Sequence, residues 1–132
     1  MGVVVDTSVL IAVIAYEPQR DTLIELTKGA DLMAPPSVHW EISNAFSAML
    51  RRNRVTLDQA LRAIEAYQRI PLRFADVELA ESLTIAAQLN IYAYDAYLIR
   101  CALKYNAPLI SLDEQLLQAA RRMSVRVIEV SR

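Results

Sequence analysis

The 132-residue sequence contains very few of the residues on which several common kinds of protein depend. Its single cysteine, Cys101, excludes an intrachain disulfide, and its single histidine, His39, leaves no Cys/His set for zinc and no Ser/His/Asp triad. Two glycines are too few for a glycine-rich phosphate loop. No apolar run reaches the ~20 residues that span a bilayer, and no basic segment with a cleavage site opens the chain. We therefore expect a cytoplasmic protein without a membrane segment.

Apolar residues are abundant: 55% of the chain is hydrophobic, while the formal net charge is only -1. The length suits one domain over residues 1–132, and the small net charge excludes an overall basic field for nucleic acid. The surplus of apolar residues predicts a subunit interface, so we expect a homodimer. The helix that contains TLIELTK and the helix that contains Trp40 and Glu41 are the candidate surfaces.

Short apolar runs alternate with helical patterns along the whole chain, which predicts an α/β domain with a parallel sheet. In such sheets, ligand sites form at the carboxyl ends of the strands. Helices are predicted from residue 7 to about 16, from Pro18 to Gly29, and at 37–52, 56–70, 78–90, 94–106 and 114–123. Strands are predicted at 3–5, 31–34, 72–74, 108–111 and 125–130.

Four of the fifteen carboxylates stand where a charge is costly. Asp6 directly follows the apolar run VVV, and Asp113 follows LISL, so both are expected just past the end of a strand. Glu41 lies within the apolar stripe of its predicted helix, far from either end. Asp95 opens another such stripe near the start of the helix YDAYLIRCAL. We predict that the four acids converge on one site.

Each acid also has a simpler local interpretation. Asp6 and Asp95 are acceptable caps for the helices that they precede or open, and Asp113 fits a first helical turn. Ser111 and Glu114 form an S-x-x-E pattern, which predicts a capping box and leaves Asp113 without a structural role. Thr7 and Ser8 turn the chain into its first helix, and one of their hydroxyls is expected to orient a carboxylate.

Converging carboxylates repel one another, and a divalent cation is the usual compensation. Oxygen ligands favour Mg²⁺ or Mn²⁺, and such clusters are typical of enzymes that hydrolyse phosphodiester bonds. Two other α/β domains with acids at strand ends do not fit. A phospho-receiver domain needs a lysine near the end of the last-but-one strand, where neither Lys28 nor Lys104 lies. A haloacid-dehalogenase-type phosphatase needs aspartate at position 8, which is Ser8.

Four segments together resemble the PIN domain, and most closely the VapC-type ribonuclease toxins of toxin–antitoxin pairs. These segments are VVVDTSVLIA, the helix after PPS that contains Glu41, YDAYLIRCA, and LISLDEQLLQAA. Their order and spacing agree with the family over nearly the whole chain. The resemblance implies a single PIN-like domain with a central parallel β-sheet flanked by helices on both faces. It also implies Mg²⁺- or Mn²⁺-dependent cleavage of RNA and a cognate antitoxin as a partner.

Residue by residue, the acids of that family correspond to a catalytic and metal-binding set at Asp6, Glu41, Asp95 and Asp113. Supporting hydroxyls correspond to Thr7 and Ser111. The fourth acidic position varies among such proteins, so Asp113 is expected either to bind the metal directly or to act through water. Two alternatives remain open: a PIN nuclease of RNA processing outside any toxin–antitoxin pair, and a catalytically silent PIN-like binding module.

Two groups of side chains are candidate RNA contacts. The densest basic region is RRNR at 51–54, extended by Arg62, Arg69 and Arg73, although cations are also favoured at the C-terminal end of a helix. Tyr92, Tyr94 and Tyr97 lie near Asp95 and could stack on bases or pack in a core or an interface.

Overall fold

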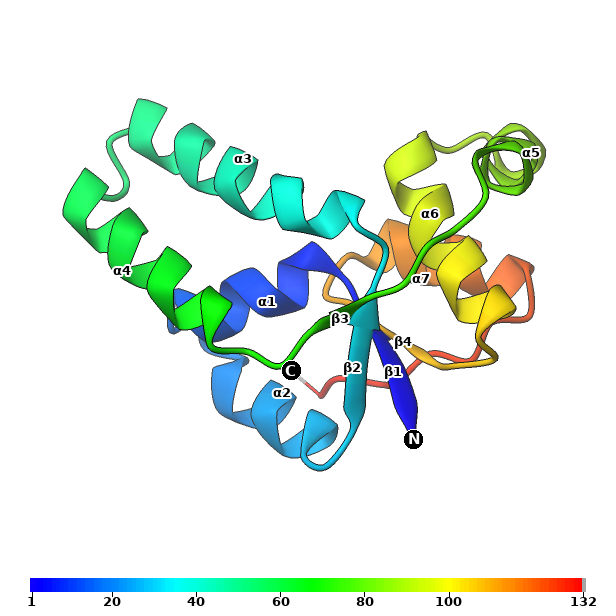
Figure 1. The fold of residues 1–132 in the computed structure, drawn as a ribbon, viewed down its shortest axis with the longest axis horizontal. Helices are drawn as coiled ribbons and strands as arrows, with labels where there is room; N and C mark the ends of the chain where they lie inside the picture. The colour runs from blue at the N-terminus through cyan, green and yellow to red at the C-terminus, as the bar shows by residue number, and fades with distance from the viewer. Residues whose placement is uncertain (132) are drawn as a thin grey trace.

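Four short parallel strands form the centre of the computed structural model, which describes residues 1–131 (Figure 1). Their order is β3-β2-β1-β4, and Val3 pairs with Leu32 on one side while Val4 pairs with Leu109 on the other. Val3, Val4 and Val5 are almost completely buried, as expected for a strand covered on both faces. The strands are β1 (Gly2–Val5), β2 (Asp31–Ala34), β3 (Arg73–Phe74) and β4 (Leu109–Ile110).

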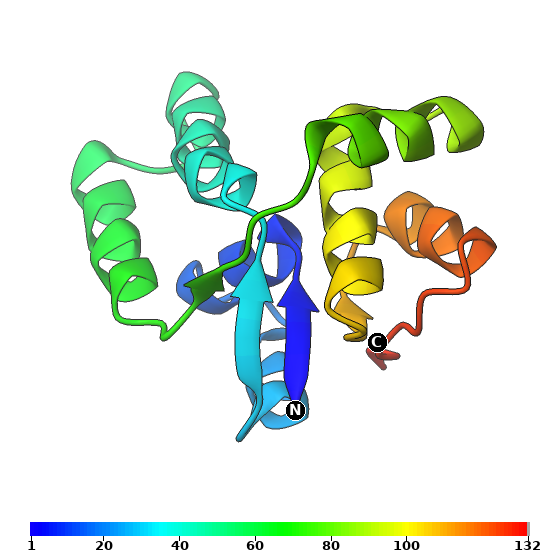
Figure 2. The same cartoon turned by 45° about the vertical axis from the view of Figure 1, so that its right-hand side comes forward.

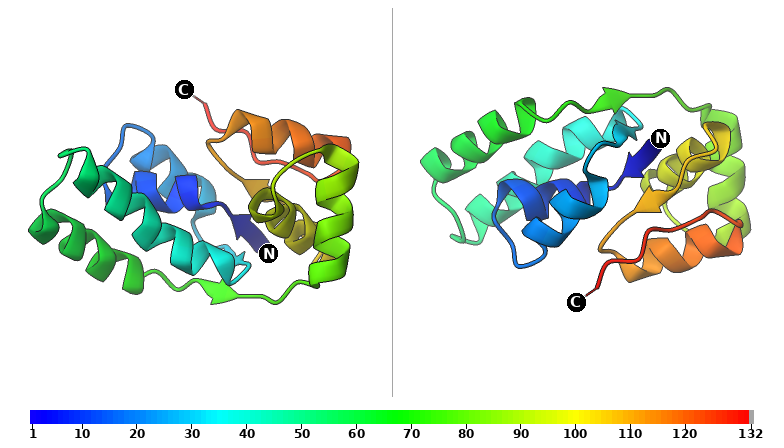
Figure 3. Two further views of the ribbon diagram at one scale, coloured as in Figure 1. Left: turned by 90° about the horizontal axis from the view of Figure 1, so that it is seen from above. Right: turned by 90° about the horizontal axis from the view of Figure 1, so that it is seen from below.

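The sheet separates two groups of helices, so the predicted α/β architecture with helices on both faces is confirmed. Helices α1 to α4 lie on one side, and α5 to α7 lie on the other (Figures 2 and 3). The first group is α1 (Thr7–Ile14), α2 (Arg20–Thr27), α3 (Ser37–Arg51) and α4 (Leu57–Gln68). The second group is α5 (Leu79–Leu89), α6 (Ala93–Lys104) and α7 (Glu114–Arg122).

Local sequence signals set several of these boundaries. Thr56 caps α4 in a full capping box, because its hydroxyl accepts from the Gln59 N–H and the Gln59 side chain accepts from the Thr56 N–H. Gly29 has a φ of 77°, a conformation that favours glycine, at the turn between α2 and β2. Within residues 1–131, no helix is long and apolar enough to cross a membrane.

The last predicted strand, at 125–130, does not form. Only an isolated bridge between Leu109 and Val127 is present. Leu109 donates to the Arg126 carbonyl and accepts from the Ile128 N–H, both at 2.9 Å. Because β4 is only two residues long, Leu109 alone supplies both backbone hydrogen bonds to this segment, and a longer strand has nothing to pair with on that edge.

Candidate functional site

Asp6 is the most buried acid at the carboxyl edge of the sheet. It follows β1 directly, its N–H donates to the Ile110 carbonyl at 3.1 Å, and the residue is only 7% exposed. Ser8 Oγ and Ser111 Oγ each donate to Asp6 Oδ2 at 2.7 Å. Since Ser111 follows β4, the pairing of β1 with β4 brings together a carboxylate and a hydroxyl that are 105 residues apart.

Asp6 does not act as a helix cap through its side chain. It occupies the N-cap position of α1, but its carboxylate makes no capping hydrogen bond. Its backbone carbonyl accepts from Val9 and Leu10 instead. Both serine hydroxyls use Oδ2, which leaves Oδ1 available to another ligand. The simpler interpretation of Asp6 as a side-chain cap of α1 is therefore wrong.

Burial raises the pKa of Asp6 above its ordinary value, and a contribution from Asp113 acts in the same direction. Hydrogen bonds from Ser8 and Ser111 lower that pKa and so favour the charged form. The two hydroxyls thus offset part of the cost of burying a carboxylate at this position.

Glu41 and Asp95 approach Asp6 from α3 and α6. Burial, followed by the charges of Asp6 and Asp95, raises the pKa of Glu41 to about 7. Burial, followed by the charges of Asp113 and Asp6, raises the pKa of Asp95 to about 6. The charges of Asp6 and Asp95 therefore influence each other and those of both remaining acids.

Two oxygen atoms near Asp6 and Asp95 are buried without a hydrogen-bond partner. They are Glu41 Oε2 and Thr7 Oγ1. An unpaired buried acceptor is costly, and such groups in folded proteins usually mark a bound ion, a water or a catalytic role. Because the acceptors here are carboxylate and hydroxyl oxygens, their chemistry fits Mg²⁺ or Mn²⁺.

The side chains are not prearranged around one point. Among residues 1–131, no three His, Cys, Asp or Glu side chains are grouped closely enough to hold one ion as they stand. A shared ion therefore requires side-chain rotation, water-mediated contacts, or both. His39 and Cys101 lie elsewhere: His39 bonds the Tyr67 hydroxyl at 3.0 Å, and Cys101 is buried in the core.

Asp113 has the structural role that the sequence pattern assigned to its neighbours. Asp113 Oδ1 accepts from the N–H groups of Gln115 and Leu116 at 3.0 and 3.3 Å, so it caps α7. The predicted capping box of Ser111 and Glu114 is wrong, because the Ser111 hydroxyl points to Asp6 and accepts from the Asp113 N–H. Asp113 nevertheless raises the pKa of both Asp6 and Asp95, so it serves the helix and the acidic site together.

The hydroxyl that orients Asp6 from within α1 belongs to Ser8. Ser8 Oγ also accepts from the Leu112 N–H at 3.0 Å, which links the start of α1 to the loop before α7. A serine two residues after an aspartate at a strand end is the sequence signal for this contact. Thr7 makes no such bond in the structure, and its supporting role stays a prediction.

Replacing Ser111 with alanine tests the support of Asp6. Ser111→Ala removes a donor to a buried carboxylate and an acceptor for the Asp113 N–H. We expect a loss of about 1–3 kcal/mol in the free energy of unfolding and of about 10–100-fold in catalytic rate. Thermal unfolding and RNA cleavage rates measure the two effects. Ser47→Ala, at an exposed serine of α3, is the control, and a Ser111 variant as active as this control would contradict the proposed support.

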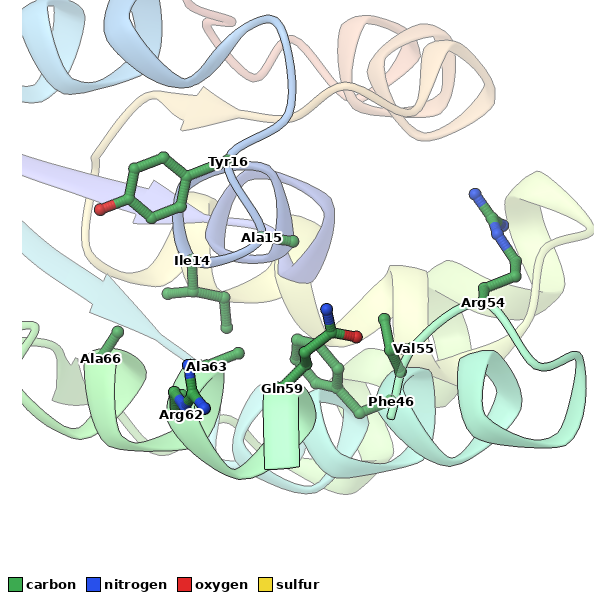
Figure 4. A pocket seen from close by; sticks show the side chains of 10 residues that line it. All are labelled: Ile14, Ala15, Tyr16, Phe46, Arg54, Val55, Gln59, Arg62, Ala63 and Ala66. Carbon is green, nitrogen blue, oxygen red and sulfur yellow. The ribbon is translucent and has the colours of Figure 1, made fainter. Parts of the chain in front are cut away.

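One hollow of the structure lies away from the acids. It has a volume of about 460 Å³ between the end of α1 and the α3–α4 hairpin (Figure 4). Its lining is largely apolar, with the side chains of Arg54 and Arg62 and no Asp or Glu. It begins at Ile14, and α1 separates it from Asp6 by about 12 Å of helix. The basic residues of the α3–α4 hairpin therefore gather at a different end of the molecule from the acidic site.

The sequence profile of the PIN domain matches residues 3–122. The chain belongs to the PIN domain family. The matched residues include all four acids and both supporting hydroxyls, and PIN domains are generally nucleases that use a divalent metal ion. No curated protein matches the chain.

Solved structures agree with this PIN fold. The crystal structure of PAE2754 from Pyrobaculum aerophilum superposes with a TM-score of 0.76 at 21% identity, covering 96% of this chain and 83% of the other. The crystal structure of VapBC2 from Rickettsia felis, bound to a DNA fragment from its promoter, superposes with a TM-score of 0.68 at 15% identity, covering 97% of this chain and 98% of the other. FitAcB from Neisseria gonorrhoeae gives 0.68 at 15% identity, with 96% of each chain covered. At these identities, the likeness shows the fold.

Proposed function

We propose that this PIN domain is a Mg²⁺- or Mn²⁺-dependent endoribonuclease and the toxin of a toxin–antitoxin pair. The observation that carries the proposal is the buried Asp6 carboxylate, held by two serine hydroxyls and surrounded by the charges of Glu41, Asp95 and Asp113. Of the four acids, only Asp113 has a structural role, as the cap of α7; within residues 1–131, Asp6, Glu41 and Asp95 make no cap or ion pair that would offset their mutual repulsion.

Asp6, Glu41, Asp95 and Asp113 would hold the metal ion. When bound, such an ion activates water and stabilises charge on the attacking and leaving oxygens of a phosphodiester. Ser8 and Ser111 hold the Asp6 carboxylate in one orientation, and their hydrogen bonds lower its pKa against the effect of burial. The unpaired Oε2 of Glu41 is available to orient the attacking water and to accept its proton.

The experiment for this proposal is incubation of the purified protein with defined RNAs and Mn²⁺. We expect internal cleavage that stops when EDTA removes the metal. Cleavage that continues unchanged in EDTA would contradict the metal dependence. RNA left intact under all divalent metals, while still being bound, would instead favour the silent binding module.

An antitoxin partner is proposed on two grounds. The sequence motifs resemble VapC-type toxins, and the similar Rickettsia structure is that of VapBC2 on promoter DNA. A PIN nuclease of RNA processing outside such a pair is the main alternative. The discriminating observation is a small open reading frame beside this gene that encodes a short DNA-binding protein. The cytoplasmic location and the extent of the domain over 1–132 stay predictions.

We also propose a homodimer. Exposed apolar side chains lie on the candidate helices α2 and α3, where Trp40 is 72% exposed, and also on α5, where Leu79 is 73% exposed and Leu83 is 66% exposed. These two leucines lie one helical turn apart and form an apolar stripe that a monomer would leave in water. Light scattering at micromolar concentration is expected to give twice the monomer mass, and Leu83→Glu is expected to lower it. A wild-type protein that is monomeric in this measurement would contradict the dimer.

A further inference from the structure

A cleft beside the acidic site has the chemistry of a nucleobase pocket. It has a volume of about 340 Å³ and is lined from the first turns of α3 and the start of α6. Both of these segments lie beyond the arrowheads of the strands in Figure 2. We name this cleft the aromatic cleft. Its lining residues are Ser37, Trp40, Glu41, Asn44 and Tyr94.

The two aromatic rings of the cleft are both exposed and held in place. Trp40 is 72% exposed and Tyr94 is 59% exposed. Trp40 contacts His39 edge-to-face, with ring centroids 5.0 Å apart, and Tyr94 contacts Tyr97 in the same manner at 6.1 Å. A single exposed aromatic residue carries little information, but two that line one cleft from different helices form a surface on which a flat ring can stack.

Polar atoms accompany the rings. Ser37, Trp40, Glu41 and Asn44 follow the spacing i, i+3, i+4, i+7, so they form one stripe of α3, while Val38, Ile42 and Phe46 face the core. Ser37 Oγ is buried and has no hydrogen-bond partner among the described residues. The Asn44 amide offers one acceptor and two donors, the groups that read the edge of a base. This stripe is suited to a ligand that is flat, apolar on its faces and polar at its edge.

Glu41 joins the cleft to the acidic site, because it lines the cleft and its carboxylate interacts with those of Asp6 and Asp95. The aromatic cleft therefore adjoins the acids, where the nucleotide next to a bound phosphodiester would lie. We propose that the aromatic cleft binds an unpaired base of the RNA, stacked on Trp40 and Tyr94 and contacted by Asn44. This assignment rests on the proposed ribonuclease function and adds to it a contact site for one base beside the scissile phosphodiester.

Because Trp40 is the only tryptophan of the chain, its fluorescence reports on the cleft directly. We expect a single-stranded RNA ten-mer, added to the whole protein in EDTA, to quench Trp40 emission in a saturable manner. An RNA duplex of equal length is expected to leave it unchanged. Tyr94→Ala is expected to weaken binding about ten-fold, whereas Tyr94→Phe stays near wild type. Tyr92, which the sequence also made a candidate RNA contact, is 87% exposed beside the same helix start but does not line the cleft, so Tyr92→Ala is expected to bind RNA like wild type and is the matched comparison.

Three results would overturn the assignment. The first concerns binding, which the anisotropy of a labelled RNA strand measures: either the RNA does not bind, or it binds and leaves Trp40 emission unchanged. The second is an equal effect of Tyr94→Ala and Tyr92→Ala. The third is a change from dimer to monomer in Tyr94→Ala by light scattering, which would assign the rings to an interface. If RNA quenches Trp40 emission in EDTA but is not cleaved in Mn²⁺, the proposed nuclease function is refuted and the base-binding cleft is not. If RNA is cleaved in Mn²⁺ but does not quench Trp40 emission in EDTA, the base-binding cleft is refuted and the nuclease function is not.

Discussion

Asp6→Asn and Asp95→Asn are each expected to reduce RNA cleavage at least about 100-fold while leaving the protein folded. Each amide keeps the volume of the side chain but removes a charge from the acidic site. Loss of a direct metal ligand should exceed the 10–100-fold loss typical of groups that only orient ligands. Cleavage rates in Mn²⁺, together with circular dichroism of each variant, measure this prediction.

The control for these two variants is Asp21→Asn. Asp21 is an exposed acid in the first turn of α2, paired with Arg20 at 3.4 Å. Helix α2 lies toward the N-terminal ends of β1 and β2 in Figure 2, away from their carboxyl ends. We expect its cleavage rate to match wild type. If Asp95→Asn cleaves as fast as this control in a preparation free of host nucleases, Asp95 has no part in the chemistry and the site assignment is wrong.

Glu41→Gln is expected to raise the metal-free melting temperature at pH 8 and to change it little at pH 4.5. Burial and the neighbouring acids raise the pKa of Glu41 from 4.5 to about 7. Because the folded state binds this proton more tightly than the unfolded state, the stability of the wild type falls as pH rises from about 4.5 through 7. Glu41→Gln has no carboxyl to ionise at this position, so its stability does not fall over this pH range for that reason. Since Glu41 is only partly buried, we expect a gain of about 1–2 kcal/mol, or about 3–6 °C.

Melting curves in EDTA at the two pH values measure this gain, and Glu65→Gln, at an exposed position of α4, is the control. Excess Mg²⁺ should stabilise the wild type more than Glu41→Gln, because only the intact site binds the ion tightly. The variant thus exchanges activity for stability. A Glu41→Gln protein that is less stable than wild type at pH 8 in EDTA would mean that this carboxylate stabilises the fold.

The placement of Asp6 and Asp113 could be predicted because strand ends are readable in the sequence. VVV before Asp6 and LISL before Asp113 are apolar runs typical of buried strands, and parallel strands bring their carboxyl ends to one edge. That these acids share a metal site stays a prediction.

The sequence singled out Glu41 because it stands beside the apolar positions Val38 and Ile42, which are buried. The structure places Glu41 on the neighbouring stripe of α3, with Ser37, Trp40 and Asn44, and not within the core-facing one.

Other features depend on contacts between distant segments. The S-x-x-E pattern after β4 predicts a local capping box, but the Ser111 hydroxyl forms a stronger bond to the buried Asp6 carboxylate, and Asp113 then caps α7. The segment VRVIEV has strand composition, yet the short β4 gives it only one pairing position. The aromatic cleft likewise requires the relative placement of α3 and α6, which no local pattern contains.

The central claim is that Asp6, Glu41, Asp95 and Asp113 share one metal site. Anomalous diffraction from crystals of the wild-type protein grown with Mn²⁺ tests it most directly. We expect an anomalous peak within coordination distance of Asp6 and Asp95, and no such peak in Asp6→Asn crystals grown under the same conditions. A wild-type map without a peak at these carboxylates, or with the same peak in the Asp6→Asn crystals, would contradict the account.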